Sequence, residues 1–144
     1  MKYTDYTDST ERVDAANGTT NDGELLYREL TFEIRAALFE VYNTLGPGFR
    51  EETYRRAVLR ELKLRGLCAE PELFAEVRYK GSVIDRYRMD IVVESKVVIE
   101  LKAVEEMKAS FAAQLLSYLK ASQLRLGLLV NFGSDELYVR RFIR

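Results

Sequence analysis

Two acidic residues and a lysine occur in a short stretch of alternating polar and apolar residues, 90–102. This alternation predicts two β-strands that bury one face. If residues 94–96 form a three-residue turn, the strands pair with Asp90 opposite Glu100, and Lys102 lies one step further along the same face. A slip of one residue would move all three groups to the apolar face, so packing sets their register. The predicted apolar face consists of Met89, Ile91, Val93, Val97, Ile99 and Leu101.

Two carboxylates beside an ammonium group can form a site for a divalent metal ion. Hard oxygen ligands suit Mg²⁺ or Mn²⁺, and a neighbouring lysine can orient a water molecule or polarise a phosphate. The reaction class would be metal-assisted hydrolysis. An ordinary cross-strand Glu–Lys pair on a solvated strand face explains the same spacing, because exposed ion pairs are common. The hairpin alone leaves both interpretations open.

Three further polar residues lie on helices predicted before and after this hairpin. Gln114 and Tyr118 are four residues apart on the helix that follows Lys102. They therefore share one face of that helix, and a short connection brings this face near the end of the strand. Glu51 follows a Gly-Pro-Gly break at the start of another helix, where interaction with the helix dipole is an adequate explanation for an acid.

The remaining periodicities predict the elements that position these residues. Helical spacing indicates helices over residues 24–45, 51–65 and 105–121, and apolar runs indicate strands over residues 73–79, 83–93, 97–102, 124–132 and 137–143. The helix between the third and fourth strands predicts a parallel pair. We therefore expect an α/β (α+β) fold with the order ααβββαββ, in which helices flank a mixed sheet of about five strands.

Composition limits the possible chemistry. The 144 residues include 22 Lys and Arg, 23 Asp and Glu, and no His. The near-neutral net charge provides no global basic field, so any polyanion site must be local. Without His, the Ser-His-Asp and Cys-His catalytic arrangements are excluded. Carboxylates, lysine, tyrosine and amides remain for acid–base or metal chemistry.

Composition also suggests the organisation and location of the chain. Residues 1–23 are polar and lack periodicity, so we expect a disordered tail followed by one domain over residues 24–144. The single cysteine, Cys68, cannot form an internal disulfide and fits a reducing compartment. Neither a secretory signal nor a membrane-spanning run is evident, so we expect a cytoplasmic protein with no membrane partner.

Four ordered motifs resemble those of a known family. GFREETY (residues 48–54) fits the signature GxxExxY, and IELKAV (99–104), AQLLSYLKA (113–121) and LGLLVNFG (126–133) follow it. Together they resemble the GxxExxY protein family, which is placed in the PD-(D/E)XK nuclease superfamily. The resemblance covers residues 26–143 and implies a restriction-endonuclease-like core. Met89 stands where the superfamily's name has proline.

The resemblance implies a role for each acid and for the lysine. Asp90 and Glu100 would be the two metal-binding acids, holding one or two Mg²⁺ or Mn²⁺ ions. Lys102 would be the lysine of the (D/E)XK triplet, which positions and activates the attacking water. The backbone carbonyl of Leu101 would be an extra ligand. Glu51 would complete the metal shell directly or through water.

Further residues receive supporting roles from the same resemblance. Gln114 and Tyr118 look like the QxxxY element of RecB-type exonucleases, which would order the lysine or contact a phosphate. Arg55, Arg56 and Arg60 follow on the helix that begins at the acid of the signature. They could contact backbone phosphates, although a solvated helix face explains them as well.

These expectations lead to two classes of function. The first is Mg²⁺-dependent hydrolysis of phosphodiester bonds in nucleic acid, with DNA as the expected substrate. The second is a catalytically silent module that binds nucleic acid or protein on the same fold, since a fold does not dictate a function. A structural assembly subunit joined through an edge strand at residues 137–143 is a third interpretation. A homodimer or a partner subunit could supply a substrate clamp.

Overall fold

The computed structural model describes residues 26–144, and the predicted polar tail of residues 1–23 lies outside them. The elements, in order, are α3 (Arg28–Leu45), α4 (Glu51–Leu64), β1 (Ala69–Tyr79), β2 (Ser82–Val93), β3 (Val97–Lys102), α5 (Ala109–Ser122), β4 (Leu126–Asn131) and β5 (Tyr138–Ile143). The predicted order ααβββαββ is confirmed. The largest differences are at the starts of three elements: α3 begins after residue 24, β1 begins before residue 73, and α5 begins after residue 105. β1 accommodates Pro71 because it is an edge strand.

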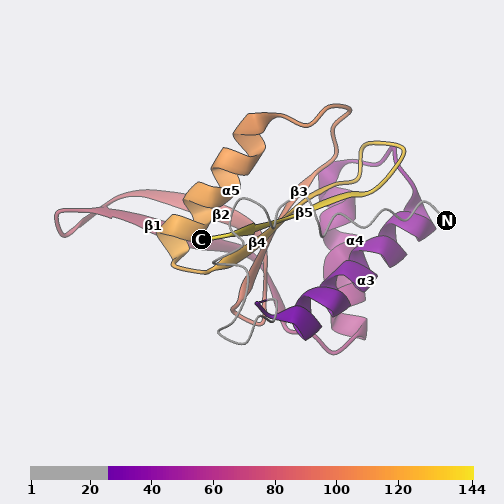
Figure 1. Ribbon diagram of the computed structural model, residues 1–144, viewed down its shortest axis with the longest axis horizontal. Coiled ribbons are helices and arrows are strands. Elements are labelled where there is room, and N and C mark those ends of the chain that lie inside the picture. Colours follow the sequence, from indigo (N-terminus) through magenta and orange to yellow (C-terminus); the bar gives the residue numbers. More distant parts are fainter. Residues whose placement is uncertain (1–25) are drawn as a thin grey trace.

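All five strands form one mixed sheet in the order β1-β2-β3-β4-β5. β3 and β4 are parallel neighbours joined through α5, as predicted, and the other neighbours are antiparallel. β4 is buried along its whole length. Helices α3 and α4 cover one face of the sheet, and α5 covers the other (Figure 1). The fold is therefore a helix–sheet–helix sandwich with β1 and β5 at its edges.

The β2–β3 hairpin is buried on both faces. Ile91 and Ile99 pack in the cluster beneath α3 and α4, whereas Val92 and Val98 pack in the cluster beneath α5. Burying an aliphatic side chain of this size contributes about 1.5 to 3 kcal/mol. The interpretation of this region as a solvated strand face is therefore wrong. The carboxylates of the hairpin lie inside the sandwich.

The alternation along β2 breaks at Asp90. Met89 packs in the cluster beneath α5, not with Ile91 on the predicted apolar face. In the opposite strand, the pairing passes over Glu72, which has a left-handed φ of 58°. The register is the same on both sides of Glu72, so no residue is inserted there. The left-handed backbone nevertheless leaves the residues on either side of it facing opposite clusters. Sequence periodicity alone carries no sign of such a change.

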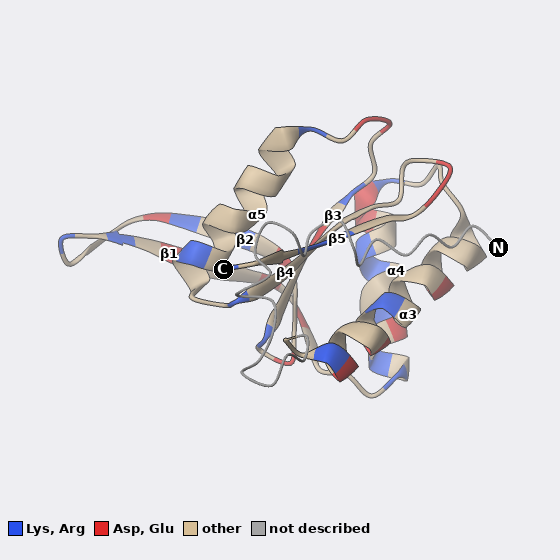
Figure 2. Ribbon diagram, in the orientation of Figure 1, with Lys and Arg blue, Asp and Glu red and all other residues tan. Residues whose placement is uncertain are grey.

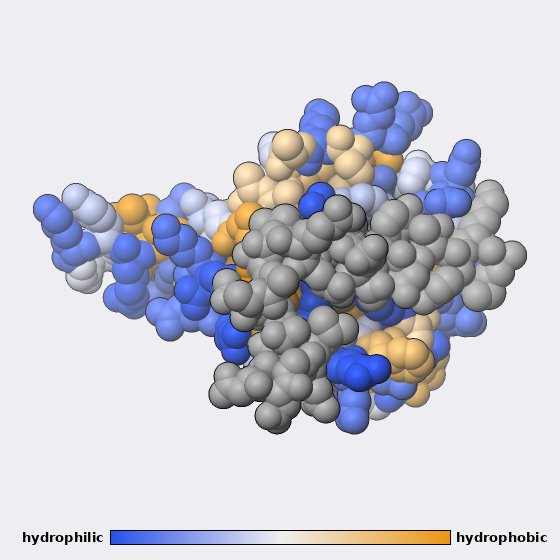
Figure 3. Space-filling model, in the orientation of Figure 1, coloured by the Kyte–Doolittle hydropathy of each residue, from blue (hydrophilic) through white to orange (hydrophobic). Residues whose placement is uncertain are grey.

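Beyond this point the β1–β2 hairpin extends as an arm, which we define as residues 76–86 (Figure 1, left). Every side chain of the arm is exposed except the half-buried Val77. Large apolar side chains, including Tyr79 and Ile84, alternate there with charged groups of both signs (Figures 2 and 3). Over residues 26–144, helices able to cross a membrane are absent.

Candidate active site

The register of the β2–β3 hairpin brings the predicted acids together. The pairs Ile91–Ile99 and Val93–Val97 match the predicted register, whose continuation sets Asp90 against Glu100. The turn occupies residues 94–96, and two of its residues adopt left-handed φ values of 52° and 53°. Such values suit a tight hairpin, whose twist matches that of the flanking strands.

Asp90 and Glu100 form a buried acidic pair, with exposed fractions of 9% and 4%. The main-chain N–H of Leu101 donates to Oδ2 of Asp90 at 2.9 Å, which orients that carboxylate. Burial raises the pKa of Glu100. A side-chain hydrogen bond between Glu100 and Asp90 and the negative charge of Asp90 raise it further. In the described part of the chain, Glu100 Oε2 is buried and accepts no hydrogen bond. A buried acceptor of this kind calls for a ligand.

Lys102 is held by two side chains of α5. Its Nζ donates to Oε1 of Gln114 at 3.3 Å and lies 4.5 Å from the centre of the Phe111 ring. The amide and the ring face together restrict where the ammonium group can go. Gln114 is itself exposed, so it reaches the lysine from the open side of the site. The structure thus brings Gln114 to Lys102, as expected from one of the two roles that the resemblance implied for Gln114.

Tyr118 lies one turn further along α5 and is close enough to the acidic pair to be affected by its charge. It is buried, and its ring centre lies 5.5 Å from that of Tyr87. Burial raises the pKa of Tyr118 to about 12, and the charges of Glu100 and then Asp90 add to this effect. Its hydroxyl therefore stays protonated and is available as a donor near the carboxylates.

Glu51 enters the site from the first turn of α4. Desolvation, followed by the charge of Asp90, raises the pKa of Glu51, while Lys102 has the opposite effect. The start of α4 is fixed by Tyr54, whose hydroxyl accepts from Phe49 N–H at 3.1 Å and donates to Gly46 O. Tyr54 thereby ties the helix to the preceding Gly-Pro-Gly turn and positions Glu51 towards the hairpin.

The chain that leaves β3 is clamped against the end of β4. Asn131 accepts from Val104 N–H at 3.0 Å and donates to Val104 O at 2.9 Å. A side chain at Gly133 would meet the backbone of Val104 at 2.4 Å, so only glycine allows this approach. Phe132 N–H also donates to Lys102 O at 2.9 Å. This clamp, formed by residues 131–133, therefore holds the backbone of Lys102 directly.

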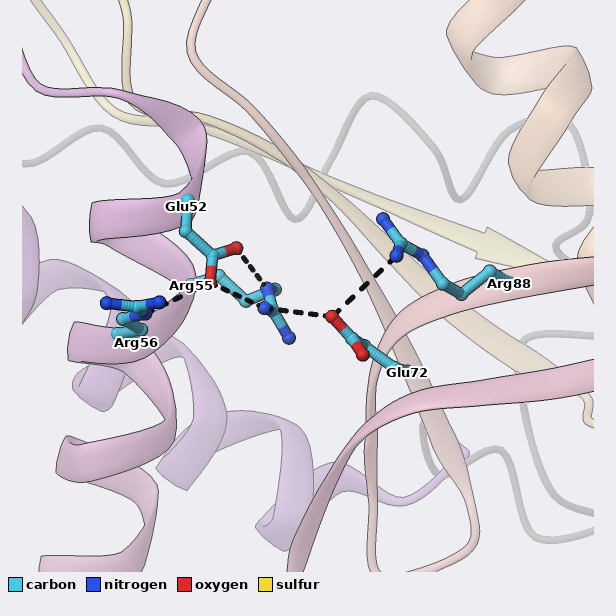
Figure 4. A network of polar contacts seen from close by, with 5 residues as sticks. All are labelled: Glu52, Arg55, Arg56, Glu72 and Arg88. Carbon is cyan, nitrogen blue, oxygen red and sulfur yellow. Dashed lines mark hydrogen bonds and ion pairs between the residues drawn. The ribbon is translucent and has the colours of Figure 1, made fainter.

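The three arginines of α4 differ in their surroundings. Arg55 makes two hydrogen bonds with Glu52, at 2.9 and 2.7 Å. Arg56 donates to the same Glu52 but leaves 77% of its side chain exposed, and Arg60 is exposed. Figure 4 shows that Arg55 points towards the sheet and joins a network that also contains Glu72 and Arg88. Only Arg55 of the three therefore borders the site.

A sequence model described as the PD-(D/E)XK nuclease superfamily matches residues 28–142. The chain belongs to this superfamily. The crystal structure of SSO0001 is similar with a TM-score of 0.53 and 23% identity, over 65% of this chain and 49% of that one. This chain thus spans about half the length of SSO0001. An alkaline exonuclease (LHK-Exo) from Laribacter hongkongensis is similar with a TM-score of 0.49 and 12% identity, over 90% of this chain and 74% of that one. No protein of curated function matches.

Nucleases of the PD-(D/E)XK superfamily generally use divalent metal ions. The buried carboxylates of Asp90 and Glu100 suit such an ion, because Mg²⁺ commonly takes one or two carboxylates and fills its shell with water and substrate oxygens. Over residues 26–144, groups of three or more His, Cys, Asp or Glu able to hold a metal ion are absent. Glu51 thus lies near the pair without forming a ready third ligand.

Several residues of this site were not predicted from the sequence. Phe111 could have been found, because it lies three residues before Gln114 and therefore on the same face of α5. Asn131 acts through contacts between segments far apart in the chain. Glu72 meets Arg55 of α4 only through tertiary packing, and Arg88 joins them through its ion pair with Glu72. These contacts leave no local signal in the sequence.

Proposed function

We propose that this protein hydrolyses phosphodiester bonds of nucleic acid, with DNA as the expected substrate and Mg²⁺ or Mn²⁺ as the cofactor. The observation that carries this proposal is the buried Asp90–Glu100 pair, in which Glu100 Oε2 accepts no hydrogen bond from the described residues. A buried carboxylate pair with an unused oxygen is costly to maintain unless a cation completes it. Superfamily membership independently favours a nuclease.

In this proposal the chain supplies two metal-binding carboxylates, from Asp90 and Glu100. The main-chain carbonyl of Leu101 would be a further ligand, and Glu51 would complete the metal shell directly or through water. When bound, a divalent ion would activate water and neutralise charge on the phosphodiester. Leu101 N–H keeps the Asp90 carboxylate in place at 2.9 Å, so this part of the site is organised before substrate arrives.

Lys102 orients the attacking water in the same proposal, and Gln114 and Phe111 hold its ammonium group. The water gives up a proton to the solvent as its oxygen forms a bond to phosphorus. The bond from phosphorus to the sugar oxygen breaks, and that oxygen takes a proton from the solvent. Tyr118 donates a hydrogen bond to a carboxylate or to the phosphate. The positive charge of Lys102 also offsets charge that develops on the phosphate.

We also infer that the chain belongs to the GxxExxY branch of its superfamily. Tyr54, the tyrosine of that signature, fixes the turn that precedes α4. It thereby positions Glu51, the glutamate of the signature, at the site. The relation of Gln114 to Lys102 likewise supports a QxxxY element.

The decisive experiment compares two aspartates of β2. Asp90→Asn should abolish Mg²⁺-dependent cleavage of a labelled DNA, because it removes the negative charge of a metal ligand while its amide oxygen can still accept from Leu101 N–H. Asp85→Asn changes the same residue type on the exposed arm and should retain full cleavage. Equal cleavage by both purified variants would overturn the proposal.

A catalytically silent binding module is the second candidate. The absence of a third carboxylate ligand near the pair, over residues 26–144, favours it. Calorimetric titration with Mg²⁺ and Mn²⁺ separates the two candidates. Binding that disappears in Asp90→Asn supports the nuclease, whereas the absence of metal binding together with intact DNA binding supports the module.

A further inference from the structure

Two guanidinium groups converge on one carboxylate oxygen beside the candidate active site. Arg55 Nη2 lies 3.1 Å from Glu72 Oε1, and Arg88 Nη1 lies 3.7 Å from the same oxygen. The three residues come from α4, β1 and β2, so the tertiary fold creates the meeting point (Figure 4). Two cations around a single anionic oxygen define a position suited to an oxygen of a phosphate.

This meeting point adjoins the proposed metal ligands. Glu72 stands between two ladder pairs, Pro71–Ile91 and Leu73–Met89, and therefore opposite Asp90. Arg55 and Arg88 both act electrostatically on Glu51 at the start of α4. A phosphate held by the two arginines would consequently lie next to the scissile phosphate, which would be held by a metal ion on the acidic pair.

The members of this network differ in how firmly they are held. Arg55 is 14% exposed and is fixed by its two hydrogen bonds with Glu52, whether or not Glu72 is present. Glu72 and Arg88 are 46% and 58% exposed, so water competes with their ion pair. Glu72 is therefore the member that a phosphate can displace. Its left-handed φ of 58°, unusual for a residue with a side chain, shows that the surrounding fold holds this position.

We propose that Arg55 and Arg88 bind a phosphate of the nucleic acid adjacent to the scissile phosphate, and that Glu72 occupies this subsite until the substrate displaces it. This inference rests on the proposed function for the class of ligand. In this proposal Arg88 binds the phosphate, and Glu72 occupies the same position when no substrate is bound. Removing the Glu72 charge should therefore strengthen nucleic-acid binding, and removing Arg88 should weaken it.

The arm contains a matched control for both substitutions. Glu76 lies 2.9 Å from Arg78 and 3.8 Å from Arg86, again as one carboxylate between two arginines. Glu76 and Arg86 are 40% and 63% exposed, which is close to the values for Glu72 and Arg88. Glu76→Gln and Arg86→Gln thus change the same charges on the same two strands. The change in general electrostatic attraction to DNA is therefore the same for the variants at residues 72 and 88 as for the control variants at residues 76 and 86.

The experiment measures binding of a fluorescein-labelled DNA duplex by anisotropy in EDTA, where no cleavage occurs, at several salt concentrations. Glu72→Gln should tighten binding roughly threefold or more beyond Glu76→Gln, because it frees a phosphate contact. Arg88→Gln should weaken binding and lower the salt slope by about one relative to Arg86→Gln. The gain from Glu72→Gln should disappear in the double variant Glu72→Gln/Arg88→Gln.

Separate outcomes bear on the subsite and on catalysis. If the paired variants bind equally while the wild type cleaves DNA with Mg²⁺, the subsite is overturned and the proposed function survives. If the predicted differences appear but the wild type does not cleave, the subsite stands and the nuclease proposal fails. A wild type that neither binds the duplex in EDTA nor cleaves it with Mg²⁺ overturns both. Thermal unfolding of each variant confirms that the compared proteins are folded.

Discussion

Strand β2 has two halves that carry similar residues in opposite environments. Its inner half, from Met89 to Val93, is buried, whereas residues 82–88 are exposed or half-buried. Both halves pair with β1, but the inner half also pairs with β3 through residues 91–93. The inner half therefore lies within the sheet, and helices cover both of its faces. Burial, not residue type, separates a candidate catalytic group from an ordinary surface charge.

The two aspartates of β2 illustrate this difference. Asp85 accepts a hydrogen bond from the next residue, Arg86 N–H, at 2.8 Å. Asp90 instead accepts from Leu101 N–H on the neighbouring strand and faces Glu100. A local hydrogen bond leaves the carboxylate in water, whereas the inter-strand bond holds it within the protein. In the inner half, a charged side chain is therefore held in a fixed position in a medium of low dielectric constant.

The largest contrast should appear between lysines. Lys102→Met should lower kcat by about 100-fold or more, because the group that orients water is lost. Lys80→Met, at the tip of the arm, should change kcat little, since Lys80 is exposed and its Nζ lies 5.3 Å from the centre of the adjacent Tyr79 ring. Steady-state cleavage assays check this prediction, and equal rates for the two variants would remove Lys102 from the mechanism.

A second contrast concerns two glycines. Gly133→Ala should lower the free energy of unfolding by about 2 to 3 kcal/mol, because the new methyl group would collide with the backbone of Val104. Gly81→Ala should cost about 1 kcal/mol, since its φ of +85° is unfavourable for alanine but no atom lies in the way. Urea unfolding measures both. A Gly133→Ala protein as stable as wild type would contradict the clamp.

The raised pKa of Glu100 predicts a dependence of stability on pH. In metal-free protein the folded-state pKa of Glu100 lies above that of the unfolded chain, so the folded state holds the proton more tightly. The free energy of unfolding should therefore fall as pH rises above the unfolded pKa of about 4.3. Glu100→Gln keeps the neutral form and should raise the free energy of unfolding by roughly 1 to 3 kcal/mol near pH 8, with a smaller gain near pH 5.

Urea unfolding in EDTA at both pH values tests this prediction. Glu76→Gln on the arm serves as the control, because its carboxylate is exposed among exposed partners. The same Glu100→Gln protein should lose cleavage. A gain in stability that does not grow with pH would argue against a buried neutral Glu100.

The smallest contrast compares two isoleucines of β2. Ile91→Val should lower the free energy of unfolding by about 1 kcal/mol, because Ile91 is fully buried. Ile84→Val should change it by less than about 0.5 kcal/mol, because 62% of Ile84 is exposed. Thermal or urea unfolding measures both variants. Equal losses would mean that the arm is covered in solution.

Much of the fold could be predicted because its signals are local. Apolar spacing of 2 and 3.6 residues specified strands and helices, and the crossover through α5 implied the parallel β3–β4 pair. The position of Met89 was predicted wrongly, since the alternation assumed a regular strand and the irregularity at Glu72 breaks it. The start of α5 was also misplaced, because the segment after Lys102 is held by Asn131 instead of continuing into helix.

The sequence by itself determined the register of the central hairpin, because its side chains alternate with period two and only one register buries the apolar ones. That register placed Asp90 against Glu100. Only the tertiary structure decided that both acids are buried, that Phe111 and Gln114 hold Lys102, and that Arg55 and Arg88 meet at Glu72. These contacts join elements distant in the chain, so long-range packing creates them.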